Sequence, residues 1–406
     1  MYWIFTIKRY IEQLLMFPFV LAGKLYAKLH PLQQQYDYFF FCPSYSIGGG
    51  ERVQGDIIEA VSDKKIFVIF NRKSTNDGSL HLHDRSHTTM YDISKYTDNK
   101  YLYFMNFVYR GICAQYINQQ KKLPVVFIAQ SNFGYKVTPH IKKNVRITEL
   151  IHMYTPEFLW VWAPFVKFIH VRVLIGNTIK EKFKNAYIKN GIPLKYIDRV
   201  KIIPYCLEYM PTSLVRKGTK DNLEIYYAGR GSNQKRVWII VKIIEECRKL
   251  NLPVRFTLAG SFKNELPQSL IDDGTFIGEI KAGNPMQELH AKMDMLLMTS
   301  AWEGFPLVIM EAMSFGVVCN ICAVDEIPNY IVHQKTGLLI NEIRDEVKIQ
   351  QQAIENIKWM LTHRVACEQI IENSFQIAQE KFVRARFNNS YKEIFENPIS
   401  DIFKSE

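Results

Sequence analysis

The sequence predicts an α/β protein built from two Rossmann-like, doubly wound domains that face an interdomain cleft. Short apolar runs alternate with helical patterns from residue 36 onward, which is typical of a parallel sheet covered by helices. The alternation stops in a polar stretch that begins near residue 209 and then starts again. A chain of 406 residues is also too long for one ordinary core. Because such sheets bind ligands at the carboxyl ends of their strands, the cleft is the expected site.

The first Rossmann-like domain is expected at residues 36–207. Its strands are apolar and rich in β-branched and aromatic side chains, whereas its helices show apolar residues at three- and four-residue spacing. The predicted strands are 38–42, 66–70, 125–129 and 172–176, and the predicted helices are 52–62 and 102–119.

A linker is expected at residues 208–222, and the second Rossmann-like domain at 223–382. Residues 346–396 have a helical pattern, and their last part, 383–406, is expected to form a helix that returns toward the first domain. The other predicted elements are strands at 224–228, 255–259, 275–277, 295–298 and 317–322, and helices at 235–249, 285–293 and 307–314.

Residues 1–35 form an amphipathic N-terminal segment. Its longest apolar run has only ten residues, between Gln13 and Lys24, and a helix that spans a bilayer needs about 20. Aromatic and leucine side chains are mixed with lysines, as in helices that lie in a membrane interface. A helix that packs on the first domain fits the same pattern.

Charge is distributed unevenly along the chain. Residues 1–205 contain 28 Lys and Arg against 14 Asp and Glu, whereas the rest contain 23 against 26, so the overall excess of +11 belongs to the N-terminal half. This asymmetry suggests an anionic partner, either a membrane surface or a nucleic acid. An ordinary solvated lysine-rich surface is the alternative.

Seven cysteines are scattered through the chain, mostly within apolar runs. An odd number in a long chain indicates reduced, buried thiols in a cytosolic protein rather than a disulfide framework. Cys319 and Cys322 form a lone CxxC without a second pair or a nearby His pair, so a buried strand is expected there instead of a zinc site.

The motif with the clearest chemistry runs from Ser300 to Gly316. A strand ends near Met298, a loop with Gly304 and Pro306 follows, and a helix begins near Leu307. Proline suits a first helical turn because its missing N–H has no partner there. The helix N-terminus then offers free amides and a positive dipole to an anion. Two glutamates, at 303 and 311, flank this start and suit the binding of hydroxyl groups, although solvated glutamates are the plainer reading.

The motif resembles the EGxP…E signature of the large retaining glycosyltransferase family that includes bacterial lipopolysaccharide and capsule enzymes and glycogen synthase. This family-4 type has the GT-B fold. Other segments are similar to family motifs: 227–235 resembles its GR…K element, 335–339 its NGLL element, and 48–53 its GGAERV loop. Residues 256–260 and 276–278 resemble its next two strand ends. The resemblance covers roughly residues 38–395.

The resemblance implies roles for individual residues. Arg230 and Lys235 would neutralise the diphosphate leaving group, whose developing negative charge such cations stabilise. Glu303 would bind a donor-sugar hydroxyl, Glu311 the ribose, and His152 the sugar near the reacting carbon. The expected catalytic residues are thus His152, Arg230, Lys235 and Glu303. The expected donor-binding residues are Gly49, Gly50, Arg230, Lys235, Gly304, Phe305, Pro306, Leu307 and Glu311.

The resemblance further implies a retaining hexosyltransferase with an acceptor-binding first domain and a nucleotide-sugar-binding second domain. The nucleotide sugar is a substrate, so no cofactor is expected. Because the chain has no D-x-D motif and side-chain cations would replace a divalent ion, no metal is expected either. The expected acceptor is a glycan or lipid-linked sugar of bacterial surface polysaccharide or lipopolysaccharide synthesis. The expected location is the cytoplasmic face of the membrane, with an anionic membrane surface as partner of the N-terminal half.

Two departures from the family pattern, an aromatic segment and four lysines leave questions open. Arg236 follows Lys235 where the family has Gly, and Asn329 lies near the position of an expected Glu, which leaves the donor sugar undetermined. Residues 155–168 are rich in aromatic side chains and could place Trp160 and Trp162 at a membrane or form a buried helix. The lysines that could attract anionic headgroups are Lys121, Lys122, Lys142 and Lys143.

Two other function classes remain alternatives. An epimerase-like enzyme that acts on nucleotide sugars would use the same scaffold. A non-catalytic basic protein would bind nucleic acid, but the chain has no helix-turn-helix, zinc-finger or RNP-type pattern, so no nucleic-acid partner is expected. A complete Walker P-loop and a full GxGxxG are also absent.

Overall fold

The apolar runs of the sequence form two separate, wholly parallel sheets. The structure is a computed structural model, and it describes residues 1–46, 48–215, 218, 220–280 and 283–403. The chain divides into two compact units: unit 1 comprises Met1–Pro204 and Ala385–Glu406, and unit 2 comprises Tyr205–Arg384. Three positions of the expected linker, 216, 217 and 219, lie outside the described residues.

Unit 1 contains a seven-stranded sheet in the order β3-β2-β1-β4-β5-β6-β7. Its strands are β1 (Tyr38–Cys42), β2 (Ile66–Phe70), β3 (Thr88–Asp92), β4 (Val125–Ala129), β5 (Arg146–Ile151), β6 (Val171–Leu174) and β7 (Val200–Ile202). Its main helices are α1 (Tyr2–Leu15), α2 (Phe17–Leu29), α3 (Gly49–Ala60), α6 (Tyr103–Asn118), α9 (Asn177–Asn190) and α16 (Arg384–Glu396). Shorter helices are α4 (Leu80–His83), α5 (Ser94–Thr97), α7 (Asn132–Val137), α8 (Leu159–Trp162) and α17 (Ile399–Ile402).

Unit 2 contains a six-stranded sheet in the order β10-β9-β8-β11-β12-β13. Its strands are β8 (Leu223–Ala228), β9 (Val254–Ala259), β10 (Phe276–Gly278), β11 (Met295–Met298), β12 (Val318–Cys322) and β13 (Leu338–Ile340). Its helices are α10 (Val237–Lys249), α11 (Gln268–Asp272), α12 (Asn284–Lys292), α13 (Leu307–Ser314), α14 (Glu346–Thr362) and α15 (Arg364–Lys381).

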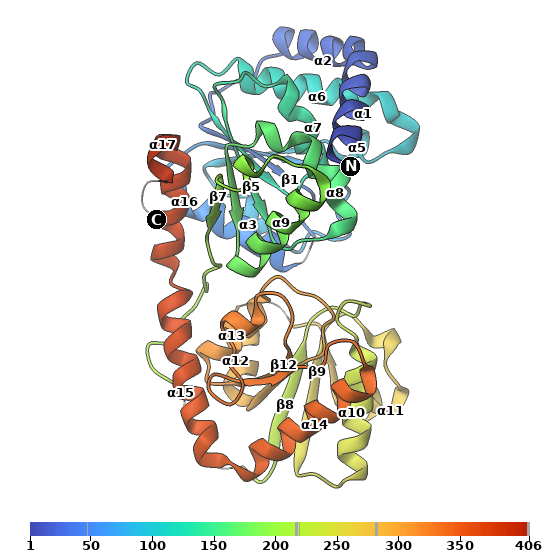
Figure 1. Cartoon of the computed structure of the whole chain (residues 1–406), viewed down its shortest axis with the longest axis vertical. Helices are drawn as coiled ribbons and strands as arrows, with labels where there is room; N and C mark the ends of the chain where they lie inside the picture. Colours follow the sequence, from blue (N-terminus) through green and yellow to red (C-terminus); the bar gives the residue numbers. More distant parts are fainter. Residues whose placement is uncertain (47, 216–217, 219, 281–282, 404–406) are drawn as a thin grey trace. The chain divides into compact units, whose positions relative to one another are not determined.

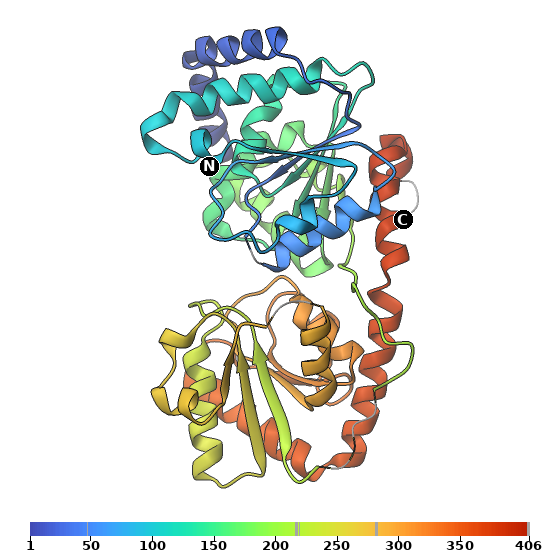
Figure 2. The same ribbon diagram turned by 180° about the vertical axis from the view of Figure 1, so that it is seen from behind.

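Both sheets have the strand order of a Rossmann fold, and unit 1 adds one strand to it. In each unit the chain winds outward in one direction from its first strand and then returns to wind in the other direction. Helices cover both faces of each sheet, as Figure 1 shows and Figure 2 repeats from behind. The predicted pair of doubly wound α/β domains is therefore confirmed.

Several predicted elements match the structure at both ends. Strands β1, β2, β4 and β11 and helix α13 have the predicted bounds. Strand β12 contains Cys319 and Cys322, as expected, and all seven cysteines are free and buried. Long apolar runs place these elements unambiguously because their side chains have no solvent face.

Four strands were not predicted: β3, β5, β7 and β13. Strand β5 reads as polar because it carries Arg146 and Glu149, yet Glu149 is fully buried. Its carboxylate accepts a hydrogen bond from Arg172 of β6, and the Arg172 guanidinium lies 4.7 Å from the ring centroid of Trp162. The partner that makes this buried charge acceptable is 23 residues away, so no local pattern reveals it.

One expectation about unit 1 was wrong, and of the two alternatives for residues 155–168 the structure supports burial for Trp162. Gly49 and Gly50 do not lie in a loop but in the first turn of α3, with Gly48 as the N-cap residue. Trp162 does not reach the surface, since it is 6% exposed and covers Arg172. Trp160, by contrast, is 42% exposed.

The C-terminal residues complete the core of unit 1. The Phe395 ring of α16 lies 5.3 Å from Tyr38, 6.0 Å from Phe40 and 5.8 Å from Phe127, measured between centroids. Arg146 donates to the carbonyl oxygen of Ile394 at 2.8 Å. Residues almost 250 positions apart in the sequence therefore share one core.

Candidate functional site

The two charged motifs of unit 2 lie in adjacent loops at one edge of its sheet. Strand β8 pairs with β11 in parallel, and the strand order reverses its direction between these two strands. Residues 229–236 follow β8, and residues 299–306 follow β11. Both loops thus leave the carboxyl ends of the strands at the topological switch point, where ligands bind in open α/β sheets.

The loops are joined by an ion pair between two predicted site residues. Lys235 Nζ lies 2.6 Å from Glu303 Oε1, and the side chains are only 15% and 6% exposed. Gln234 adds a hydrogen bond from its amide nitrogen to the Trp302 carbonyl oxygen at 2.8 Å. A cation and a carboxylate are therefore held side by side at the switch point, one able to bind phosphate and the other hydroxyl groups.

Arg236, the last residue of the loop after β8, connects this loop to the loop after β11. Its guanidinium donates to the carbonyl oxygens of Thr299 at 2.6 Å, Ser300 at 2.9 Å and Ile343 at 2.9 Å. Its backbone has φ of 51°, in the left-handed region that favours glycine. The motif that this segment resembles has Gly at this position, and Arg236 keeps the left-handed backbone of that Gly. Its side chain then links the two loops to the segment around Ile343.

Asp325 orients Glu303 and was not predicted from the sequence. Its Oδ2 accepts a hydrogen bond from the Glu303 backbone N–H at 2.7 Å, and its own φ is 49°. Asn329, at the departure noted above, donates to Glu326 at 2.5 Å. The sequence offered only a carboxylate three residues past the end of β12, and the backbone N–H that it binds lies 22 positions earlier in the chain.

Helix α13 begins beside this ion pair. Its N-cap residue is Pro306, one position before the first turn, and its first turn has no acidic side chain. Among the residues that the structure describes, the backbone N–H groups of Gly304, Phe305, Leu307 and Val308 have no hydrogen-bond acceptor. The start of α13 therefore presents unsatisfied donors and the positive end of a helix dipole, as the sequence predicts.

Glu311, in the second turn of α13, faces a buried histidine. Glu311 Oε2 lies 3.5 Å from His290 Nε2 of α12. The other ring nitrogen of His290 is 2.7 Å from the Tyr226 hydroxyl of β8. His290 is 1% exposed, so strand β8 and helix α12 together fix the side of α13 that carries this carboxylate.

Arg230 occupies the outer part of the loop after β8. Its carbonyl oxygen accepts a hydrogen bond from the Tyr227 hydroxyl at 2.8 Å, whereas its side chain is exposed. Within the described ranges, the guanidinium has no ion-pair partner. The backbone at 230 is therefore anchored, and the charge is available to an incoming anion.

The remaining predicted site residues belong to unit 1, where the structure brings two of them together. A β-carbon added to Gly50 would lie 3.4 Å from His152 Nε2. Gly50 is in the first turn of α3 after β1, and His152 directly follows β5. The residue His152 is half-buried and its Nε2 atom is buried, and burial lowers the pKa of His152 to about 4. The ring is therefore neutral at pH 7.

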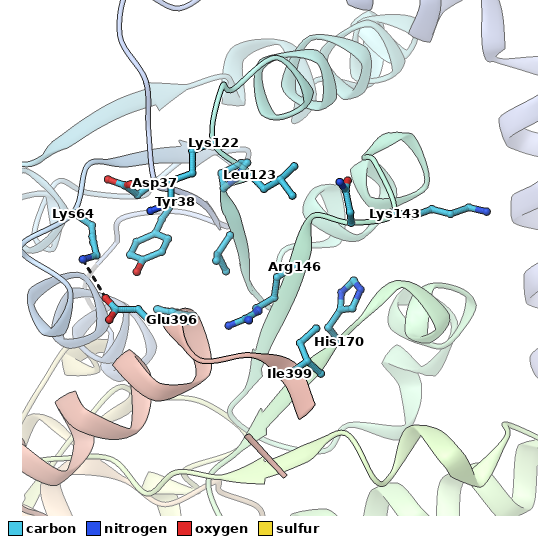
Figure 3. A pocket seen from close by; sticks show the side chains of 14 residues that line it. Asp37, Tyr38, Lys64, Lys122, Leu123, Lys143, Arg146, His170, Glu396 and Ile399 are labelled. Atoms are coloured by element: carbon cyan, nitrogen blue, oxygen red, sulfur yellow. Dashed lines mark ion pairs between the residues drawn. The ribbon is translucent and has the colours of Figure 1, made fainter. Parts of the chain in front are cut away.

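A cavity of about 560 Å³ lies at the opposite edge of the unit 1 sheet (Figure 3). It is lined by Tyr38, Val125 and Arg146, at the amino ends of their strands, and by Phe395 and Glu396 of α16. Lys64 is paired with Glu396 at 3.2 Å. Because Lys64 and Arg146 hold the C-terminal segment in place and the cavity lies away from the strand carboxyl ends, this cavity is not the candidate active site.

Comparison with known proteins agrees with this geometry. Residues 222–358 match the family model of the glycosyl transferases group 1. N-acetyl-alpha-D-glucosaminyl L-malate synthase of Bacillus anthracis is 34% identical over 114 residues, which are 28% of this chain and 29% of that protein. The match thus spans less than a third of the relative's length.

Solved structures resemble the whole chain more broadly. Anabaena Alr3699/HepE in complex with UDP and glucose superposes with a TM-score of 0.66 at 15% identity, over 89% of this chain and 100% of that one. The lipopolysaccharide outer core galactosyltransferase WaaB gives 0.63 at 16%, over 88% and 98%. The chain therefore has the GT-B fold of these glycosyltransferases. Within that fold, segment 222–358 is the part that is similar to the glycosyl transferases group 1.

Proposed function

We propose that this protein is a retaining, metal-independent glycosyltransferase that moves a hexose from a nucleotide sugar to a hydroxyl group of an acceptor. The observation that carries the proposal is the group of polar side chains and backbone amides at the switch point of unit 2. There the Lys235–Glu303 pair, at 2.6 Å, adjoins the free amides at the start of α13. This arrangement suits a ligand that combines a diphosphate with sugar hydroxyl groups.

In the proposed reaction, the bond between the anomeric carbon and the diphosphate oxygen breaks, and a bond to the acceptor oxygen forms. Negative charge develops on the leaving diphosphate, where Arg230, Lys235 and the α13 amides stabilise it. The acceptor hydroxyl proton passes to an oxygen of the same diphosphate. Glu303 and Glu311 accept hydrogen bonds from sugar hydroxyl groups, and neutral His152 hydrogen-bonds the sugar.

Metal independence is part of this proposal. Its support is that two side-chain cations, Arg230 and Lys235, belong to the same loop after β8, where the proposal places the diphosphate. Full turnover in the presence of EDTA is the expected result. A loss of turnover that Mg²⁺ or Mn²⁺ restores would contradict it.

The proposed acceptor is a glycan or a lipid-linked sugar of bacterial surface polysaccharide or lipopolysaccharide synthesis, used at the cytoplasmic face of the membrane. Support comes from the structural neighbours, one of which is a lipopolysaccharide outer core galactosyltransferase. The basic balance of residues 1–205, 28 against 14, supports an anionic membrane surface as the partner. Within the described residues, no helix combines the length and apolarity that crossing a bilayer requires.

The decisive experiment screens UDP-, GDP-, dTDP- and ADP-sugars by thermal shift and then follows the stabilising donor by NMR. Release of the nucleotide together with a new glycoside of unchanged anomeric configuration supports the proposal. An inverted product contradicts the retaining mechanism. Epimerised donor formed without acceptor supports the epimerase-like alternative, and the absence of stabilisation by every donor contradicts nucleotide-sugar chemistry.

A further inference from the structure

Helices α1 and α2 expose an unusually apolar surface on unit 1. Trp3, Ile7, Tyr10, Leu14, Phe17 and Leu25 are each more than half exposed. A surface helix of a soluble protein normally turns its apolar side toward the core and its charged side toward water. We call the surface formed by these six residues the outer apolar face.

The polar side of α1 faces the protein. Glu12 forms an ion pair with Arg110 of α6 at 2.7 Å, with side-chain exposures of 17% and 5%. Arg9 pairs with Glu12 as well and lies 5.8 Å from the ring centroid of Trp160. Although burial opposes ionisation, Arg110 and Arg9 keep the pKa of Glu12 below its usual value. Charged contacts therefore hold α1 in the orientation that turns its apolar residues outward.

Helix α2 packs closely on α6 through two glycines. A β-carbon added to Gly23 would lie 1.9 Å from the Val108 carbonyl oxygen, and one added to Gly111 would lie 2.0 Å from that of Val20. Only glycine permits so close an approach of two helices. Figures 1 and 2 both show α2 running beside α6. Leu21 and Leu25, which are 40% and 54% exposed, are consequently held away from the side of α2 that packs on α6.

The apolar surface extends to the start of α6. Phe19 of α2 stacks on Phe104 at a centroid distance of 4.6 Å, and Phe104 is itself 51% exposed. Tyr101 and Tyr103, next to it, are 84% and 56% exposed. Tyr and Trp at the border of an apolar surface are typical of proteins that enter the interface of a membrane.

Positive charge surrounds the outer apolar face. Lys8 and Lys28 are exposed and Lys24 is half-buried, whereas the acidic residue of this segment, Glu12, is used by the ion pair with Arg110. With 14 and 13 residues, α1 and α2 are each about 20 Å long. Both are too short for a hydrocarbon core of about 30 Å, but long enough to lie in its interface.

We propose that α1 and α2 dock on a bilayer of anionic phospholipid, with the outer apolar face among the acyl chains and Lys8, Lys24 and Lys28 among the phosphates. This inference rests on the proposed peripheral location and names the surface responsible. It does not depend on the sugar-transfer chemistry. A second copy of this chain is the competing occupant, and its lysines would face one another rather than an opposite charge.

The test measures flotation of the full-length protein with phosphatidylcholine vesicles that contain or lack phosphatidylglycerol. The wild-type chain is expected to float with the anionic vesicles, and Ile7→Asp/Leu14→Asp to lower the bound fraction at least tenfold. Ile188→Asp on α9, where Ile188 is 61% exposed, is the matched control and should bind as the wild type does. Lys8→Glu/Lys28→Glu should weaken binding to the phosphatidylglycerol vesicles alone.

Three outcomes would overturn the proposal: no flotation of the wild type, equal losses in the α9 control, or a dimer in sedimentation velocity that Ile7→Asp/Leu14→Asp dissociates. Circular dichroism and thermal unfolding establish that each variant is folded. Vesicle binding without transfer activity would contradict the proposed function only. Donor turnover by a variant that no longer floats would leave the docking surface supported, because the reacting groups lie elsewhere in the sequence.

Discussion

At the scale of single residues, the chemistry of unit 2 depends on charges that the fold has already partnered. Lys235 is neutralised by Glu303 at 2.6 Å, and Glu311 lies 3.5 Å from His290. In the proposed reaction, the diphosphate competes with Glu303 for Lys235, and hydrogen bonds from sugar hydroxyl groups replace part of the interaction that Glu303 loses.

Lys235→Ala should lower kcat/KM for the donor about 100-fold, since removal of one group that stabilises developing charge typically has this effect.

Glu311→Ala should raise KM for the donor, because it removes an acceptor for ribose hydroxyl groups. Steady-state kinetics with the donor found in the screen will measure both. Lys249→Ala, at the exposed end of α10, is the control. Wild-type rates in both site variants would refute the site assignment.

His152→Asn should reduce turnover by the same factor at pH 6 and pH 8. Burial lowers the pKa of His152 to about 4, so the folded protein keeps the ring neutral above about pH 5, and no proton is gained or lost in this range. The pH dependence of kcat/KM, measured for wild type and variant, tests this. His30→Gln, at an exposed site, is the control. A loss that changes tenfold between the two pH values would show that His152 titrates during the reaction.

At the scale of elements, strand ends and helix starts are joined by side chains that bridge loops. Arg236 connects the loops after β8 and β11, and Asp325, after β12, holds the backbone of Glu303. The αL conformation of Arg236, with φ of 51°, costs about 1 kcal/mol relative to glycine. Three charge-assisted hydrogen bonds to carbonyl oxygens offset this cost.

Stability should therefore decrease in the order Arg236, Arg236→Gly, Arg236→Ala. The glycine variant loses the three hydrogen bonds but relieves the backbone strain, whereas the alanine variant loses the bonds and keeps the strain. We expect the two variants to differ by about 1 kcal/mol in the free energy of unfolding, measured with urea. An alanine variant as stable as the glycine variant would show that the backbone at 236 is not strained.

At the scale of the whole molecule, the chain enters unit 2 after residue 204 and returns to unit 1 after residue 384. The returning segment is not a tail, because α16 supplies Tyr391 and Phe395 to the core around β1 and β4. The two connections make the stability of unit 1 depend on residues at both ends of the sequence.

Phe395→Ala should destabilise unit 1 by about 3–4 kcal/mol, since it empties a buried site among Tyr38, Phe40 and Phe127. Urea unfolding followed by hydrogen exchange of β1 and β4 amides will assign the loss to unit 1. Val365→Ala, at a side chain that is 83% exposed on α15, should change little. Equal exchange rates in Phe395→Ala and the wild type would contradict the role of the C-terminal helix.

The local sequence determined the α/β class and most strand positions of this protein, along with the loops of residues 229–236 and 299–306. The strand pattern of apolar runs such as 38–42 and 295–298 is visible in neighbouring residues alone. The glycines and the proline of the motifs likewise affect the backbone only within about one turn. Only the tertiary structure decided which charges are buried, because Glu149 is paired with Arg172, the Arg236 guanidinium with the Thr299 carbonyl oxygen, and Glu303 with Lys235. It also decided that α1 turns its apolar side outward, since Arg110, almost 100 residues away, holds the Glu12 side of the helix inward. Such contacts arise from chain folding over long sequence separations, and no periodicity in the sequence records them.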